Sequence, residues 1–81
     1  MSFILKYINN ITKADIYNFG VKEGIKLEEY EVGIIYDYIK NEYIRILDNP
    51  EDVLCEAKIK LRNETYCKIL ELYQKYKKYL N

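Results

Sequence analysis

Hydrophobic residues recur at spacings of three and four along most of the chain, which is the pattern of amphipathic helices. The apolar stripes consist of Ile16, Phe19 and Gly20; Val32, Ile35 and Ile39; Val53, Leu54, Ala57 and Leu61; and Tyr66, Ile69, Leu70, Tyr73 and Leu80. No segment alternates apolar and polar residues for long enough to form a strand. A chain of 81 residues holds a single core. The pattern therefore predicts an all-α fold, a compact bundle of four helices in one domain over residues 1–81.

The first two helices are predicted to form a hairpin closed by a Gly-Ile turn. Thr12 is a good N-cap, and Asp15, three residues later, completes a variant of the capping box. Gly24 can adopt the left-handed conformation that ends a helix, and Ile25 can then fold back as in a Schellman motif. The next helix is predicted to begin near Glu28, although glutamate is rarely chosen as a cap.

Turn and capping residues mark the later boundaries. In Asn49-Pro50, asparagine is a good cap and proline suits the first helical position. Asn63-Glu64 indicates a break followed by a new helix start. Residues 43–47 fit either a helix end or a short extended connection, and both alternatives stay open. A short additional helix over Ser2 to Ile8 is also compatible with the sequence.

Charge and cysteine content restrict the compartment and the partners. Thirteen basic and thirteen acidic residues cancel, so no overall charge attracts the chain to DNA or to an anionic membrane. The N-terminal segment is apolar for only three residues before Lys6, too few for a signal peptide, and no membrane-spanning run is present. We expect a cytoplasmic protein in which Cys55 and Cys67 stay reduced. Two cysteines twelve residues apart, without any histidine, do not make a zinc site within one chain.

The predicted hairpin has the layout of a DNA-reading helix-turn-helix, but its charges oppose that function. In such motifs the first residues of the second helix face base edges and phosphates. Here those residues are Glu28, Glu29 and Glu31, and no Lys or Arg follows in that helix before Lys40. Since phosphate contacts supply most of the affinity, we expect no binding of duplex DNA through this hairpin.

The C-terminal segment offers a second route to nucleic acid. Its tyrosines and lysines interleave, an arrangement in which rings stack on single-strand bases and cations contact phosphates. The candidate contact residues are Lys75, Lys77, Lys78 and Tyr79. The alternative interpretation is that the tyrosines pack on the apolar face and that the lysines complement the helix dipole. RNA or single-strand binding is therefore the alternative function.

Residues for catalysis are scarce. The chain has no histidine to act as a base near neutral pH, and its three glycines are too scattered for a phosphate-binding loop. Either cysteine would need a base to become a nucleophile, and none is evident. We expect no enzyme activity, no cofactor and no bound metal.

Three segments resemble a family of short, uncharacterised helical proteins from spore-forming Firmicutes. They are NITKADIYNFGVKEGIKLEEYEV, IRILDNPED and NETYCKILELYQKY, which carry the pairs Gly24-Ile25 and Glu64-Thr65 and the connection Ile46-Leu47-Asp48. The chain departs from the family at Glu28, where Ser or Thr is usual, and at Asn63, where Pro often stands. The resemblance implies a helical fold and a bacterial cytosolic setting, and it implies no activity.

Apolar residues outside the predicted core favour a role in protein interaction. A small helical domain cannot cover all of them, and tyrosine is enriched at interfaces. The candidate interaction residues are Tyr17, Tyr30, Tyr36, Ile59 and Leu72. Gly20 and Gly33 lie inside predicted helices, either because another helix approaches closely there or because these positions tolerate change. We expect binding to another protein or self-association, most simply as a homodimer.

Overall fold

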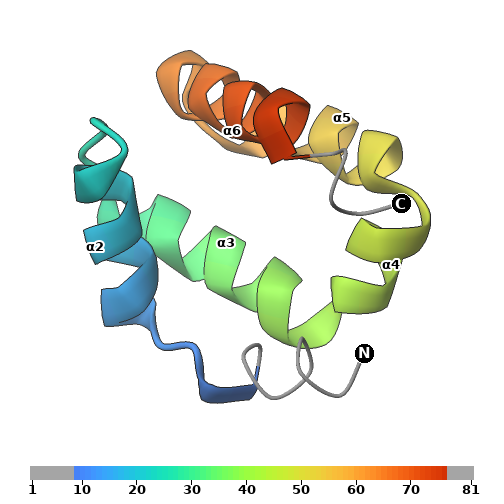
Figure 1. Ribbon diagram of the computed structural model, residues 1–81, viewed down its shortest axis with the longest axis horizontal. Helices are drawn as coiled ribbons and strands as arrows, with labels where there is room; N and C mark the ends of the chain where they lie inside the picture. Colours follow the sequence, from blue (N-terminus) through green and yellow to red (C-terminus); the bar gives the residue numbers. More distant parts are fainter. Residues whose placement is uncertain (1–8, 77–81) are drawn as a thin grey trace. The chain divides into compact units, whose positions relative to one another are not determined.

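The computed structural model describes residues 9–76, and every regular element within that range is a helix (Figure 1). The helices are α2 (Lys13–Lys22), α3 (Glu29–Asn41), α4 (Tyr43–Asp48), α5 (Pro50–Lys60) and α6 (Asn63–Tyr76). The predicted all-α class is confirmed. Residues 43–47, which the sequence left open as a helix end or an extended connection, form a separate short helix, α4, between α3 and α5. The optional helix over Ser2 to Ile8 lies outside the described residues.

Contacts between residues fall into two units, Met1–Tyr43 and Ile44–Asn81. In the first unit α2 packs against α3, and in the second α5 packs against α6. The single domain over residues 1–81 stays a prediction.

The start of α2 has the predicted capping box. The Thr12 backbone N–H donates to Oδ2 of Asp15 at 2.9 Å, and the Asp15 backbone N–H donates to Oγ1 of Thr12 at 3.1 Å. Each side chain thus satisfies a backbone donor that the helix itself leaves without a partner.

The end of α2 has the predicted Schellman motif. Gly24 has a φ of 91°, in the region that favours glycine. The Ile25 N–H donates to the carbonyl of Gly20 at 2.8 Å, and the Gly24 N–H donates to that of Val21 at 3.0 Å. These two bonds turn the chain back toward α2, and the side chain of Leu27 then packs against Gly20.

The core cluster of the first unit contains Ile16, Leu27 and Val32, and Tyr38 on α3 is also buried. Partly buried hydrophobic side chains surround this cluster, namely those of Ile11, Tyr17, Ile25, Ile35, Tyr36 and Ile39. The sequence pattern placed Phe19 on the apolar face of α2, but Phe19 is not part of the core, because 49% of its surface is exposed. The buried line on α2 runs through Ile16 and Gly20, four residues apart, and Phe19 lies at the edge of that face.

α3 begins where the sequence predicts, with Glu28 as its N-cap residue. The Glu28 backbone N–H donates to Oε1 of Glu31 at 3.0 Å, so the acid three residues into the helix supplies the missing acceptor. Glu31 is fully buried. Its carboxylate therefore bonds within the helix start and does not face outward with Glu29.

In the second unit, Ala57, Leu61 and Thr65 are buried. Pro50 occupies the first turn of α5 as predicted, and Asn49 is the N-cap residue. The Asn49 side chain makes no capping bond to the backbone of α5, and its Nδ2 donates to Oδ2 of Asp52 at 2.9 Å. Ahead of this turn, an Arg45–Glu56 ion pair joins α4 to α5.

Candidate interaction groove

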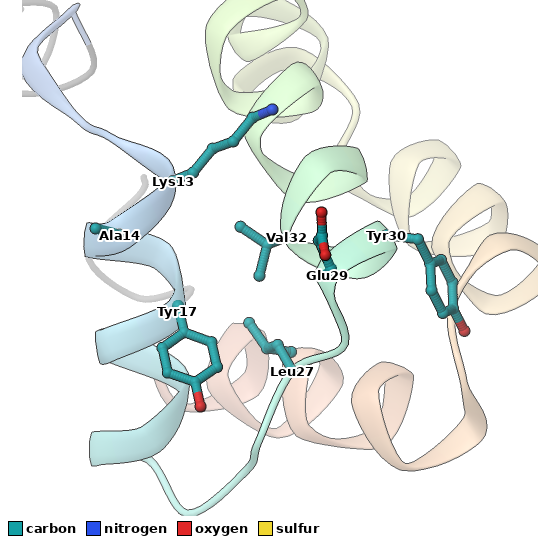
Figure 2. Close-up of a pocket in the computed structure, with 7 residues that line it drawn as sticks. All are labelled: Lys13, Ala14, Tyr17, Leu27, Glu29, Tyr30 and Val32. Carbon is teal, nitrogen blue, oxygen red and sulfur yellow. The ribbon is translucent and has the colours of Figure 1, made fainter.

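An open groove of about 790 Å³ lies between α2 and the first turns of α3. Its lining residues are Lys13, Ala14, Tyr17, Leu27, Glu29, Tyr30 and Val32 (Figure 2). All seven belong to the first unit. Most of the lining surface is apolar, and charged side chains come from only two of these residues, Lys13 and Glu29.

The α2 wall follows from helical spacing. Lys13, Ala14 and Tyr17 lie within the first two turns, and Ala14 and Tyr17 are three residues apart on one face. The small side chain of Ala14 is exposed, whereas Tyr17 is half-buried and packs against the core. The capping box formed by Thr12 and Asp15 holds the first turn of α2, which carries Lys13 and Ala14, in a fixed conformation.

The floor of the groove depends on the turn after α2. Leu27 is buried, and its side chain packs against Gly20: a Cβ added there would lie 3.1 Å from Cγ and Cδ1 of Leu27. Val32 is buried one turn into α3. Figure 2 shows the side chains of Tyr17, Leu27 and Val32 in the space between the two helices.

Tyr30 forms the outer edge on α3. This large aromatic residue is exposed, with 53% of its surface accessible to solvent. Figure 2 shows the ring extending away from α2, on the other side of α3 from Tyr17 and Leu27. The groove and an exposed aromatic side chain are therefore neighbours on the same unit.

The two charged side chains of the groove have opposite signs. Lys13 is exposed on α2 and Glu29 is exposed at the start of α3, and neither has an ion pair within residues 9–76. The ammonium group of Lys13 lies 5.5 Å from the ring centroid of Tyr36, and that of Lys40 lies 5.7 Å from it. Contacts of this kind hold the lysines by the electrostatic attraction between a cation and a ring face.

The predicted interaction residues separate into three groups. Tyr17 and Tyr30 both line the groove. Tyr36 packs against the core beneath two lysines and does not line it. The remaining two lie in the second unit: Ile59 on α5 is 85% exposed, and Leu72 on α6 is partly buried.

Five groove residues were missed by the sequence prediction, namely Lys13, Ala14, Leu27, Glu29 and Val32. Val32 was predicted only as core, and Glu29 only as an obstacle to DNA binding. The pair of staple positions Leu27 and Val32 around the start of α3 was the one available signal, because a staple fixes the angle at which the chain enters the helix. The exposed positions Lys13 and Ala14 carry no such signal.

The alternative nucleic-acid residues are only partly within the described chain. Lys75 is exposed on the last turn of α6, whereas Lys77, Lys78 and Tyr79 lie outside the described residues. RNA or single-strand binding stays a prediction. For the duplex-DNA alternative, the acidic helix start contains one residue, Glu31, that is buried and unable to face a groove of DNA.

Cys55 and Cys67 are free and exposed. Within residues 9–76 there is no group of three His, Cys, Asp or Glu side chains placed to hold a metal ion. In the same range, no helix is both long enough and apolar enough to cross a membrane.

Comparison with protein-family models, curated proteins and solved structures gives no match for this chain. The resemblance to the helical Firmicutes family therefore stays a prediction.

Proposed function

We propose that this chain is a non-enzymatic interaction protein of the bacterial cytoplasm, and that it binds a protein partner through the groove between α2 and α3. The observation that carries the proposal is the apolar lining of that groove, to which Tyr17 and Tyr30 contribute. Tyrosine suits an interface because its ring supplies apolar contact area and its hydroxyl supplies a hydrogen bond.

The groove also defines the chemistry of its occupant. An apolar side chain can enter between Ala14 and Leu27, where water has few polar partners. At the rims, an acid would meet Lys13 and a base would meet Glu29. The expected partner segment thus presents apolar or aromatic residues flanked by charges of both signs.

Non-enzymatic action is supported by the chemistry of the side chains. The whole sequence lacks histidine, and the groove contains neither cysteine nor a cluster of acids that would raise the basicity of a carboxylate. Lysine and glutamate on opposite rims are better suited to orienting a partner than to proton transfer.

The test is a pull-down with the tagged chain from native-host lysate, with and without nuclease treatment, read by mass spectrometry. The groove variant is Ala14→Glu, which places a long charged side chain in the groove at an exposed helical position. Its matched control is Gln74→Glu, which makes the same charge change at an exposed position of α6.

We expect one or more proteins to be retained by the wild type and by Gln74→Glu and lost with Ala14→Glu. Calorimetric titration with each purified candidate then establishes direct binding. Equal retention by all three forms would contradict the groove. Capture that disappears on nuclease treatment would instead support the nucleic-acid alternative.

A further inference from the structure

The groove and the exposed ring of Tyr30 lie next to each other on the first unit. We propose that the occupant of the groove is a second copy of this chain, related by a two-fold axis, with Tyr30 of each copy entering the groove of the other. This inference rests on the proposed function and names its partner.

The shape of the surface supports a two-fold arrangement. A symmetric dimer buries the same patch on both copies, so the patch must contain both a projection and a recess that accepts it. Tyr30 is the projection, with 53% of its surface exposed and its ring directed away from α2 (Figure 2). The recess is the apolar space bounded by Ala14, Tyr17 and Leu27.

The charges of the groove support the same arrangement. In the proposed dimer Lys13 of one copy faces Glu29 of the other, and the two-fold axis repeats the same pair. Both side chains are exposed and lack an ion pair within the described part of the chain, so neither has to give one up. The balance of thirteen basic and thirteen acidic residues removes any overall repulsion between copies.

The small area of the proposed interface limits the affinity of the dimer. One groove and one ring per copy make an interface at the small end of the range for specific complexes, so the dimer should dissociate on dilution in the micromolar range. Rim charges contribute modestly, whereas the central aromatic residue should contribute most.

Sedimentation velocity over about 5 to 500 µM, a range that brackets a micromolar dissociation constant, tests the proposal. We expect reversible dimerisation of the wild type. Lys13→Glu and Glu29→Lys should each weaken dimerisation about tenfold or more, since each variant sets two like-charge pairs against each other. Tyr30→Ala should weaken it further, and Ile59→Ala, which trims an exposed side chain on α5, should not.

The most discriminating experiment is sedimentation of an equimolar mixture of Lys13→Glu and Glu29→Lys. A Lys13→Glu copy carries acids at both positions and a Glu29→Lys copy carries lysines at both, so both pairs are attractive only in the mixed dimer. We expect the mixture to recover dimerisation that neither variant shows alone. If Lys13 and Glu29 acted only within one copy, mixing the two variants would recover nothing. Circular dichroism melts of each variant verify that it is folded.

Three results would overturn the proposal: a wild type that stays monomeric throughout, a dimer unaffected by the groove variants, or a mixture that recovers nothing. These results are distinct from failure of the proposed function. If the wild type is monomeric but captures a protein that Ala14→Glu does not retain, the groove binds a different protein and only the self-pairing inference fails. If Ala14→Glu changes neither capture nor association, both fail.

Discussion

The side chain of Leu27 packs directly on the backbone of Gly20, four residues beyond Ile16 on the buried face of α2. A Cβ built at Gly20 would lie 3.1 Å from Cγ and Cδ1 of Leu27 and 3.2 Å from the carbonyl oxygen of Ile25. A group does approach Gly20 closely, but it is the Leu27 side chain in the segment after α2 and not another helix, as one of the two interpretations expected. Gly33 differs, because a Cβ there would meet nothing within 4 Å.

This contrast predicts opposite effects for two identical substitutions. Gly20→Ala should destabilise the chain by about 1 kcal/mol, because crowding against Leu27 and Ile25 outweighs the gain in helix propensity. Gly33→Ala should stabilise it by about 0.5 to 1 kcal/mol, since alanine loses less backbone entropy inside a helix. Urea denaturation followed by circular dichroism measures both. A Gly20→Ala variant as stable as Gly33→Ala would contradict the packing of Leu27.

A second prediction concerns the start of α3. Glu31→Ala should destabilise the chain by about 1 to 2 kcal/mol, because the Glu28 N–H loses its acceptor and a buried side chain is removed. Glu31→Gln keeps an acceptor oxygen at the same place, so its free energy of unfolding should fall by less than half as much as that of Glu31→Ala. Thermal unfolding of the two variants compares them directly. If Gln and Ala are equally destabilising, the capping bond is not the source of the effect.

The third prediction concerns Thr65 in the first turn of α6. This residue is fully buried, and its hydroxyl has no hydrogen-bond partner within residues 9–76. Thr65→Val keeps the shape and removes the unpaired group, so the free energy of unfolding should rise by about 1 kcal/mol. Thr65→Ser keeps the hydroxyl and deletes a methyl group, so the free energy of unfolding should fall by about 1 kcal/mol. The opposite order in chemical denaturation would show that the hydroxyl is satisfied in solution.

Local features of the fold were readable from the sequence because each depends on residues a few positions apart. The Thr12–Asp15 capping box and the Gly24 turn are of this kind, and both are confirmed. The helix over residues 43–47 was not decided by the sequence, since a six-residue helix contains less than two full turns of periodic pattern.

Features that depend on tertiary contacts were not readable. Nothing in the sequence pattern pairs Leu27 with Gly20, and nothing in it indicates that Lys13 and Lys40 flank the ring of Tyr36. Of the seven groove residues, only Tyr17 and Tyr30 were predicted, as apolar residues outside the core. Lys13 and Ala14 become part of a site only once the Schellman turn brings α3 beside α2.

The proposed docking surface is the groove between α2 and α3, and its proposed occupant is a second copy of the chain. The most direct measurement is a dilution series followed by amide chemical shifts, over about 5 to 500 µM, which brackets a micromolar dissociation constant. We expect concentration-dependent shifts at the groove residues Lys13, Ala14, Tyr17, Glu29 and Tyr30, and little change at Ile59 on α5. Shifts that stay constant over this range, or that centre on α5 or α6, would contradict the proposal.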